Sequence, residues 1–562
     1  MSHQSKTNKI QTTVDLLIIG SGTGMAAALA AKEKGLKCMV IEKSRWIGGS
    51  TAMSEGTLWI PANQLTKSKK NRDNIKKGAE YLESIIDNSS LNHLLSAFLK
   101  NGEATIKMLE RTTPLKFSWI KGFPDYYSEN PGGLYKGRTI ECKPFNISTL
   151  GKEALKIRPG IISGFNNLPQ TRHDYKWTNL FLRKPSKSIP IIMKRYIQKA
   201  GNRITGKKYV VSGQALAAGM FAGLIRAHIP VLMETKLIEL LIHNDNVYGA
   251  VIEKNNKRFN IKTKKGVILA TGGFEHNLRL RQNSQPTYVE KDRSLGAEDN
   301  TGDGIIAAVK INAHLSHMDQ SWWFPTIPSV LKGGKPALLF AERSYPGCFI
   351  INKEGKRFIN ETLDYVSFGQ KIMEMEKKLK PVKNIWLIFD ETYRKRYVFA
   401  GTILPGRPLP YHWYKTGVAF TADTPELLAK AIDVPVANFT ETLKRYNRLA
   451  IIGKDLDFAK GEKAQDRYYG DPTIKPNPNM DILTGKLYAV KIVLSDLGTN
   501  GGLSTDEYAR VLKTNKTPVN GLYAIGNTSA NIFGKIYPGA GATIAQGLIY
   551  GYIAACHAAF IR

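Results

Sequence analysis

The chain has 562 residues, which is enough for more than one domain with a sizeable hydrophobic core. A composition of 42% hydrophobic and 9% aromatic residues is that of a folded globular protein and excludes a largely disordered one. No apolar run approaches the roughly 20 residues of a membrane span, which excludes an integral membrane protein. The 80 Lys and Arg residues against 47 Asp and Glu give a net charge of +33. Such a charge indicates either an anionic surface as partner or a compositional habit of the host.

The N-terminal residues and the cysteines predict a cytoplasmic protein. Residues 1–13 are polar and lack the apolar core of a secretory signal. The cysteines are scattered, show no C-x-x-C spacing, and are expected to be buried reduced thiols: Cys38, Cys142, Cys348 and Cys556.

Residues 14–43 predict a strand, a glycine-rich turn, a helix and a second strand, in that order. The turn is Gly20-Ser21-Gly22-Thr23-Gly24, and Glu42 ends the second strand. Glycines here let the backbone approach a pyrophosphate at a helix N-terminus, and the acid accepts a ribose hydroxyl. Met25 stands where the third glycine of G-x-G-x-x-G is usual. The pattern favours a dinucleotide site over an ordinary glycine-rich turn.

Later elements indicate a second domain inserted into the first. Helices are expected within 72–112, over 214–228 and over 541–559, and strands over 231–233, 237–242, 247–253, 258–263, 266–273 and 521–526. Residues 320–485 differ in composition and pattern, because they contain paired strands and many prolines. A composition rich in small residues returns after Lys486. We therefore expect a nucleotide-binding domain, 1–319 and 486–562, interrupted by a second domain, 320–485.

Positive charge is concentrated in residues 151–209, which contain 14 Lys and Arg against two acids. Residues 187–199 intersperse apolar side chains with cations, as helices lying on a membrane surface do. The basic insertion, about 155–205, is therefore predicted to make peripheral contact with the inner face of the cell membrane. A solvated excursion packed on the body is the alternative. No nucleic-acid motif accompanies the charge, and no nucleic-acid partner is expected.

Taken together, the motifs resemble the FAD-dependent flavoproteins of the fumarate reductase/succinate dehydrogenase type. Besides the glycine turn and the acid, the matching motifs are Gly48-Gly49-Ser50-Thr51, Ala270 to Gly273, Thr301 to Gly304 and Gly521 to Asn527. The G-S-G-x-G form of the turn also occurs in this family, which accounts for Met25. The resemblance implies an α/β fold in which an α+β substrate domain interrupts a Rossmann-like FAD-binding domain.

The same resemblance implies which residues hold FAD. They are Gly20, Ser21, Gly22, Thr23, Gly24, Met25, Glu42, Lys43, Gly48, Gly49, Ser50, Thr51, Ala270, Thr271, Gly272, Asp303, Gly526, Asn527, Ala542, Thr543 and Ile544. No metal is expected, because the histidines lack ligand spacing. His314 and His317 could share one helix face, and we interpret them as structural.

Within this family the chain resembles the 3-ketosteroid Δ1-dehydrogenases. The tyrosine motifs that carry this resemblance are Pro124-Asp125-Tyr126, Asn360-Glu361 with Tyr365, and Tyr537-Pro538-Gly539-x-Gly541. They imply FAD-dependent 1,2-desaturation of a 3-ketosteroid, with hydride passing from C1 to flavin N5 and FAD reoxidised by a separate, quinone-like acceptor. Tyr365 as tyrosinate takes the C2 proton, Tyr126 assists it, and Tyr537 with the Gly541 N–H holds the C3 carbonyl oxygen. The basic insertion would suit sterol-derived ketones at the membrane.

These residue types suit the chemistry independently of the family. A C–H bond is acidic only beside a carbonyl, so the reaction needs donors on the carbonyl oxygen, a base over the adjacent carbon and a hydride acceptor. Tyr537 and Gly541 flank a Pro-Gly turn at a helix start and are expected to converge on one oxygen. A second phenol that donates to a tyrosinate favours the ionised form.

Alternative functions stay open. A 3-keto-5α-steroid Δ4-dehydrogenase would abstract hydrogen at C4 and C5 of a related substrate. A fumarate reductase-like enzyme needs cationic clamps for two carboxylates, whereas residues 535–539 read Lys-Ile-Tyr-Pro-Gly. A basic membrane- or nucleic-acid-binding protein with a vestigial flavin fold would lack the yellow colour of a flavin.

Overall fold

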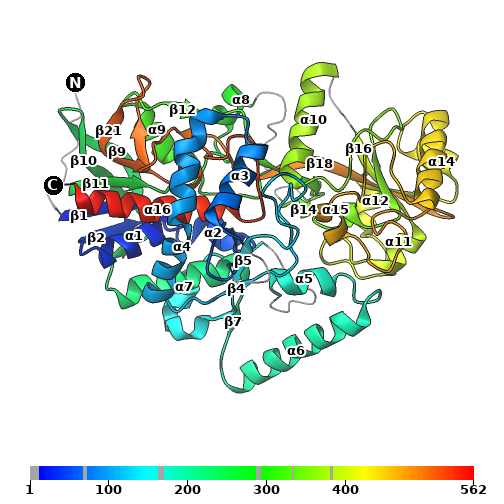
Figure 1. Cartoon of the computed structure of the whole chain (residues 1–562), viewed down its shortest axis with the longest axis horizontal. Coiled ribbons are helices and arrows are strands. Elements are labelled where there is room, and N and C mark those ends of the chain that lie inside the picture. Colours follow the sequence, from blue (N-terminus) through cyan, green and yellow to red (C-terminus); the bar gives the residue numbers. More distant parts are fainter. Residues whose placement is uncertain are drawn as a thin grey trace.

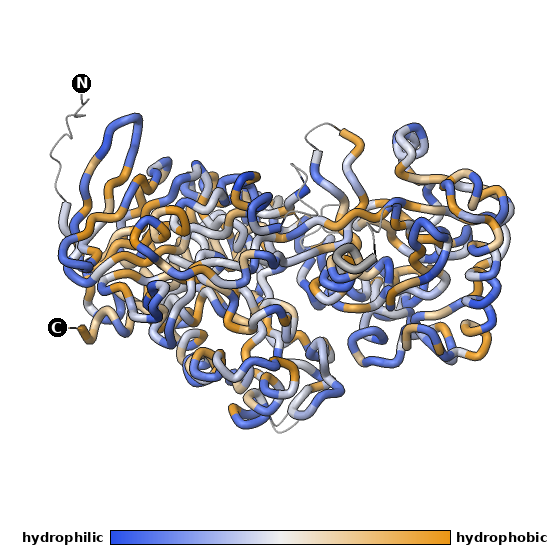
Figure 2. Tube along the Cα trace, turned by 90° about the horizontal axis from the view of Figure 1, so that it is seen from above, coloured by the Kyte–Doolittle hydropathy of each residue, from blue (hydrophilic) through white to orange (hydrophobic). Residues whose placement is uncertain are grey.

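The structure is a computed structural model that describes residues 12–67, 73–161, 170–285, 293–331, 334–379 and 384–561. In this part of the chain a larger and a smaller sheet-containing region lie side by side along the long axis (Figure 1). The hydropathy-coloured view from above shows the same arrangement, with hydrophilic loops at the outer ends and apolar stretches inside each region (Figure 2). The expectations for residues 1–11 and for residues 162–169 of the basic insertion lie outside the described residues.

The larger region is built on a parallel sheet. Its parallel strands follow the order β21 (Pro518–Ala524), β11 (Lys257–Leu269), β1 (Thr12–Ile19), β2 (Cys38–Ile41) and β8 (Val231–Leu232). Helix α1 (Gly24–Glu33) connects β1 to β2 and packs against α7 (Ser212–Arg226) and α16 (Ala542–Phe560). The strand–turn–helix–strand unit predicted for residues 14–43 is confirmed, and the C-terminal helix lies beside it (Figure 1).

Strand β11 corrects the prediction of separate strands over 258–263 and 266–273. It is one continuous strand that ends at Leu269 and pairs with β1 from Ile261 onward. Its other edge pairs first with β10 (Asn246–Lys254), which also pairs with β9 (Lys236–His243), and then with β21. Gly266 therefore lies where the strand beside β11 changes from β10 to β21, and it does not mark a break in β11.

Smaller elements cover the larger sheet. The short sheet β3 (Thr57–Trp59), β5 (Thr139–Cys142) and β4 (Phe117–Trp119) lies beside α2 (Gly49–Met53), α3 (Ile75–Ile85) and α4 (Asn92–Thr112). The remaining elements are β6 (Phe145–Asn146), β7 (Tyr209–Val210), α8 (Leu278–Ser284), α9 (Asp303–Val309), β12 (Leu315–Ser316), β19 (Gly502–Leu503) and β20 (Arg510–Leu512).

The smaller region is an antiparallel sheet with helices around it. Its strands follow the order β14 (Ala337–Leu338), β13 (Ser321–Ile327), β18 (Leu487–Thr499), β16 (Ile385–Asp390) and β15 (Cys348–Ile351), and β17 (Ala419–Ala422) pairs with β18. The helices are α10 (Tyr365–Leu379), α11 (Glu391–Arg396), α12 (Tyr411–Lys415), α13 (Pro425–Ala431), α14 (Val436–Ile452) and α15 (Ala464–Tyr469).

Strand β18 bears on the proposed domain boundaries. It begins directly after Lys486 and pairs with both β13 and β16, so it belongs to the smaller sheet. Strands β12 and β19 pair with each other in the larger region. We therefore propose to retain the division near residue 319 and to move the second boundary from 486 to a point after Thr499.

The basic insertion contains α5 (Arg172–Thr178) and α6 (Pro185–Ile204). Helix α5 lies against the body, whereas α6 extends away from it along the lower side of the molecule (Figure 1). The paired strands β6 and β7 bring the two ends of the excursion together. The insertion thus consists of an embedded part and a projecting part.

Candidate active site

A cavity lies at the carboxyl ends of the parallel strands, where sheets of this kind bind ligands. Its wall contains Ile19, Ile41, Ala270 and Ile525, which end or directly follow β1, β2, β11 and β21. Most of the predicted site residues line it: Gly20, Ser21, Gly22, Thr23, Glu42, Lys43, Gly49, Ser50, Thr51, Ala270, Thr271, Gly272, Asp303, Tyr365, Gly526, Asn527, Tyr537, Gly541, Thr543 and Ile544.

The predicted residues Gly24, Met25, Gly48 and Ala542 lie behind the cavity wall. A Cβ on Gly24 would stand 2.9 Å from the Ile18 side chain, so this glycine permits close packing of α1 on β1. Met25 and Ala542 are fully buried in α1 and α16. Gly48 precedes α2 in a left-handed conformation. These residues shape the cavity and do not face it.

The glycine turn is held by Glu42. Gly20 has a φ of 109°, and a Cβ there would lie 2.1 Å from the Ala270 carbonyl oxygen, so only glycine fits. The Ser21 backbone N–H and hydroxyl donate to one Glu42 oxygen at 2.9 and 2.6 Å, and the Ser44 N–H donates to the other at 2.8 Å. The oxygen that accepts from Ser44 keeps acceptor capacity for a further hydroxyl.

The residues of this cavity fit a bound dinucleotide such as FAD. The N-cap of α1, Thr23, makes no side-chain capping hydrogen bond and the first turn holds no acid, so the helix leaves N–H donors for an anion. Helix α16, which begins after Gly541, also lacks a side-chain cap and an acid in its first turn. Lys43 and Asp303 form an ion pair of 2.8 Å with each other at the cavity wall.

The predicted tyrosines come together. The ring centroids of Tyr365 and Tyr537 are 5.4 Å apart, those of Tyr126 and Tyr537 5.6 Å, and those of Tyr126 and Tyr365 6.3 Å. Tyr365 and Tyr537 line the cavity, and Tyr126 packs behind them, 5% exposed. Trp322 and Phe324 of β13 lie against the group, at 5.2 Å from Tyr537 and 4.9 Å from Tyr365.

Tyr126 reaches this position through contacts between its loop and the turn after Tyr537. The Pro538 carbonyl oxygen accepts hydrogen bonds from the Tyr126 N–H at 3.2 Å and from the Tyr81 hydroxyl at 2.7 Å. Asp125 accepts from Trp59 Nε1 at 2.9 Å and pairs with buried Arg138. The Pro-Asp-Tyr and Tyr-Pro-Gly motifs are therefore parts of one hydrogen-bonded structure.

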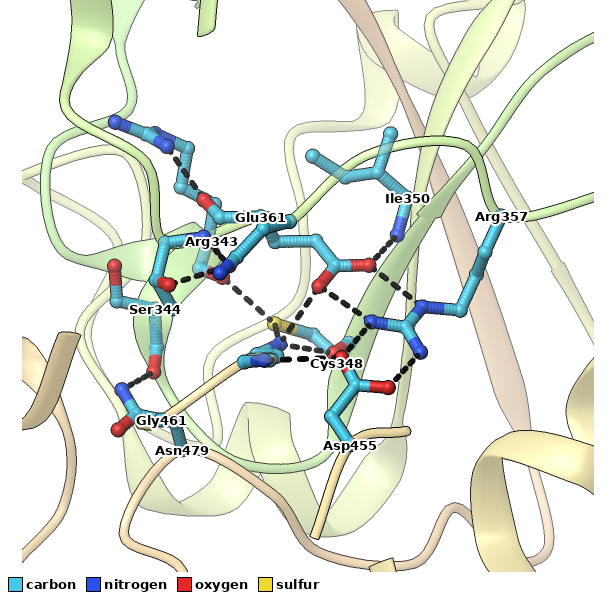
Figure 3. Close-up of polar contacts among 12 residues, drawn as sticks. Arg343, Ser344, Cys348, Ile350, Arg357, Glu361, Asp455, Gly461 and Asn479 are labelled. Atoms are coloured by element: carbon cyan, nitrogen blue, oxygen red, sulfur yellow. Dashed lines mark hydrogen bonds and ion pairs between the residues drawn. The ribbon is translucent and has the colours of Figure 1, made fainter. Parts of the chain in front are cut away.

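A buried ion-pair network in the smaller region holds Glu361, which lies four residues before Tyr365 (Figure 3). Arg357 binds Glu361 at 2.9 Å and Asp455 at 2.9 Å, and the Ile350 N–H donates to Glu361 at 3.1 Å. Asp364 caps α10 by accepting from the N–H groups of its first turn. These contacts fix the segment that places Tyr365 as the first residue of α10.

Tyr537 and Gly541 lie next to each other at the start of α16. The Gly541 N–H donates to the Tyr537 hydroxyl oxygen at 3.0 Å. Gly541 has a φ of 91°, and a Cβ there would lie 2.1 Å from the Thr57 carbonyl oxygen. Burial raises the pKa of Tyr537, and hydrogen bonds from Tyr365, Gly541 and Thr543 oppose this rise.

The electrostatics of Tyr365 differ from those expected of a free base. Burial, and then the neighbouring Tyr537 and Tyr126, raise its pKa well above the ordinary value. Tyr126 makes a ring contact with Tyr365, and within the described residues no hydrogen bond joins their hydroxyls. The predicted role of Tyr365 as a tyrosinate would therefore require other groups near the cavity that lower its pKa.

Sequence reasoning missed Glu55 and Arg172 as site residues. Glu55 lines the cavity together with Tyr365 and Tyr537, and Arg172 of α5 forms an ion pair with it. Neither belongs to a short motif, and Arg172 lies within the segment predicted to bind a membrane. No local signal in one sequence could have paired them.

The expectation that His314 and His317 share a helix face is wrong. They flank strand β12, and His317 has a φ of 57°. His314 Nδ1 is 2.7 Å from the Ser504 hydroxyl, and neither histidine is among the residues that line the cavity.

Comparison with known proteins shows which family this fold belongs to. Residues 15–544 match the FAD binding domain family. A 3-oxosteroid 1-dehydrogenase of Mycobacterium tuberculosis is 40% identical over 97% of this chain and 98% of its own length. A 4-oxocyclohexanecarboxylate 2-dehydrogenase of Sinomonas cyclohexanicum is 32% identical over 97% of this chain and 92% of its own length. A crystal structure of 3-ketosteroid Δ1-dehydrogenase from Sterolibacterium denitrificans, in complex with 1,4-androstadiene-3,17-dione, superimposes with a TM-score of 0.91 at 34% identity, covering 98% of this chain and 99% of that one.

These matches span nearly the whole chain and include both regions of the fold. They confirm the predicted α/β fold class, in which a Rossmann-like FAD-binding domain is interrupted by an α+β substrate domain. The chain belongs to the FAD-binding flavoprotein family that includes the 3-oxosteroid 1-dehydrogenases.

Proposed function

We propose that this protein is an FAD-dependent 3-ketosteroid Δ1-dehydrogenase that forms the 1,2 double bond of its substrate. The observation that carries this proposal is the meeting of Tyr365, Tyr537 and the Gly541 N–H at one wall of a cavity that fits FAD. The relatives named 3-oxosteroid 1-dehydrogenase support it across nearly the full length of the chain.

We assign each residue of the site a role in this reaction. Tyr537 O–H and Gly541 N–H hold the C3 carbonyl oxygen, and the N-terminus of α16 adds positive potential where enolate charge develops. Each donor is worth ~3 kcal/mol of transition-state stabilisation. Tyr365 takes the C2 proton on its phenolate oxygen, and the buried ring of Tyr126 supports it. Bound FAD supplies the acceptor for the C1 hydride.

The body of the steroid has room in a second cavity that shares a wall with the first. Met53, Leu338 and Phe340 line both, and Tyr175 and Pro336 line the second. Large apolar side chains of this kind suit a hydrocarbon skeleton. We propose that the end of the steroid remote from C3 lies there, which leaves space for sterol-derived ketones.

The first test is anaerobic mixing of the purified yellow protein with a 3-ketosteroid such as androst-4-ene-3,17-dione. The flavin absorbance should bleach, and product analysis by NMR should show a 1,2 double bond. Desaturation of a 5α-reduced substrate at C4 and C5 would instead identify the Δ4-dehydrogenase. Absence of bleaching with every 3-ketosteroid would refute both.

The second test concerns Tyr365 itself. Tyr365→Phe should lower the rate of flavin bleaching at least 100-fold with FAD content and steroid affinity retained, because only proton removal is lost. Tyr523→Phe is the matched control, since its hydroxyl contacts His557 at 2.9 Å outside the cavity. If Tyr365→Phe instead lost its FAD, Tyr365 would be a residue needed for folding.

We further propose that the protein works in the cytoplasm on the inner face of the cell membrane, passing electrons to a quinone-like acceptor. Helix α6 supports this proposal because it projects from the body and exposes apolar residues, among them Ile197 at 67% and Met193 at 56%. Lysines lie along the same helix. No helix among the described residues has both the length and the hydrophobicity needed to cross a bilayer.

A further inference from the structure

Arg172 is a buried cation beside the proposed active site. Its side chain is 3% exposed. The guanidinium carbon lies 5.0 Å from the ring centroid of Tyr175, 5.3 Å from those of Phe123 and Tyr469, and 5.5 Å from that of Phe340. A planar guanidinium held between aromatic faces is fixed in position.

The partners of Arg172 point to the cavity. Its guanidinium forms an ion pair with Glu55 and a hydrogen bond with the Tyr469 hydroxyl. Glu55 follows α2 and lines the same cavity as Tyr365 and Tyr537, with 21% of its side chain exposed. The ion pair therefore joins the basic insertion to the wall that carries the reactive phenols.

A short aromatic path leads from Arg172 to Tyr365. Phe340 lies under the guanidinium, its ring centroid is 4.8 Å from that of Phe324, and the Phe324 centroid is 4.9 Å from that of Tyr365. Charge at Arg172 and Glu55 thus acts through a region of aromatic rings, where screening by water is weak.

We propose that Arg172 is a positioning residue for proton removal by the tyrosine group: it fixes Glu55 and neutralises its charge, so that no bare carboxylate opposes formation of the tyrosinate. This inference rests on the proposed function, because it concerns how that reaction acquires its base. It also assigns the embedded part of the basic insertion to the active site.

The pKa shifts around the pair have the following directions. Burial raises the pKa of Glu55, and Arg172 opposes that rise. Burial is the largest cause of the raised pKa of Tyr126, and the positive charge of Arg172 opposes that rise. Glu55 adds to the rise at both Tyr365 and Tyr537.

Other charged or titratable groups also face these residues, and the variants below leave them in place. Around the phenols they are Asp364, Tyr469 and Arg343, and around Arg172 they are Tyr468, Tyr175, Tyr469, Glu141 and Asp174.

Single substitutions can make the net charge of the Arg172–Glu55 pair either negative or positive. Arg172→Gln removes the cation and leaves the carboxylate, so the pH at which flavin bleaching reaches half its maximal rate should rise. Glu55→Gln removes the carboxylate and leaves the cation, so the same pH should fall. Each change should amount to at least about half a pH unit. Arg172→Lys keeps the charge and should stay near the wild-type pH, as should the double variant Arg172→Gln/Glu55→Gln.

Two readouts separate this inference from the proposed function. The first is the pH profile of single-turnover flavin bleaching with steroid. The second needs no steroid: the ultraviolet absorbance of tyrosinate is titrated in each background, and the titration of the same background carrying Tyr365→Phe is subtracted. If wild-type protein never bleaches, the proposed function fails while the second readout still tests the charge coupling.

The control is Arg183→Gln, which removes an ion pair of 2.8 Å with Asp471 from the same insertion. It should leave both readouts unchanged. Shifts in the same direction for Arg172→Gln and Glu55→Gln, or no shift in either, would overturn the inference. If Arg172→Gln does not fold, the less buried Glu55→Gln decides alone, because its shift must be downward.

Discussion

At the scale of single residues, Glu361 explains why an Asn-Glu pair precedes Tyr365. Its carboxylate is completely buried and binds Arg357 and the Ile350 N–H (Figure 3). Burial acts to raise the pKa of Glu361, but Arg357 and Lys460 outweigh it and hold this pKa below the ordinary value. The motif therefore acts on Tyr365 through the backbone that carries it.

Removing one member of this buried pair should be costly. We expect Glu361→Gln to lower the free energy of unfolding by about 3 kcal/mol at neutral pH, because Arg357 would be left without one of its two anions. Since the folded-state pKa lies below the unfolded one, the cost should be present above about pH 4.3 and vanish as the pH falls through the folded-state value. Denaturant unfolding at a series of pH values measures it.

The matched control is Arg445→Gln, which removes an ion pair with Asp457 on the surface of the smaller region. Its unfolding transition should coincide with that of the wild type. An equally large loss in both variants would mean that the buried network has no special role.

The sequence predicted those parts of the site whose residues stand in motifs of adjacent residues. Tyr126, Tyr365 and Tyr537 each stand in a motif of adjacent residues, and so does the glycine turn with Glu42. Arg172 and Glu55 are separated by 117 residues and meet only in the folded chain. One sequence holds no record of such a pairing, so this ion pair could not be predicted.

At the scale of elements, α6 is the part of the basic insertion available to a membrane. A deletion of about residues 160–205 would be a poor test of this role because it would remove Arg172 as well. Point substitutions on α6 avoid the problem: Met193→Glu/Ile197→Glu should abolish cosedimentation with vesicles of anionic phospholipid, because both side chains are more than half exposed. FAD content and bleaching by a soluble steroid should stay unchanged.

Ile451→Glu on α14 provides the control, since this side chain is equally accessible, at 72% exposure, on another face. It should cosediment as the wild type does. Undiminished binding of the α6 variant would favour the solvated excursion over the membrane contact.

Element prediction failed where the neighbour of a strand, rather than its own residues, decides the structure. A glycine at position 266 looks like the end of one strand and the start of another. In the fold β1 pairs with β11 on one edge from Ile261 to Leu269, on both sides of Gly266, and only the partner on the other edge changes. Likewise, β18 joins the smaller sheet through pairing with β13 and β16, although the residues after it return to the larger region.

At the scale of the whole molecule, buried carboxyl groups make stability depend on pH. Burial raises the pKa values of Glu141, Glu275 and Glu342 to about 7. Between the ordinary value of about 4.3 and pH 7, these three carboxyl groups therefore bind more protons in the folded protein than in the unfolded chain. By linkage, their contribution to the free energy of unfolding falls as the pH rises through this range, and its loss is complete above pH 7.

Glu342 offers the sharpest test, because it is 1% exposed and one of its oxygens has no hydrogen-bond partner within the described residues. Its other oxygen accepts the Gly401 N–H at 3.1 Å, a bond that a glutamine oxygen can keep. Glu342→Gln should therefore stabilise the holoprotein by about 3 kcal/mol at pH 8 and change it little at pH 4.5, measured as the difference in Tm from wild type. Glu441→Gln, at a side chain 65% exposed, should show no such dependence. A gain for Glu342→Gln of equal size at both pH values would mean that the fold tolerates the charge and that a packing change, not proton binding, is responsible.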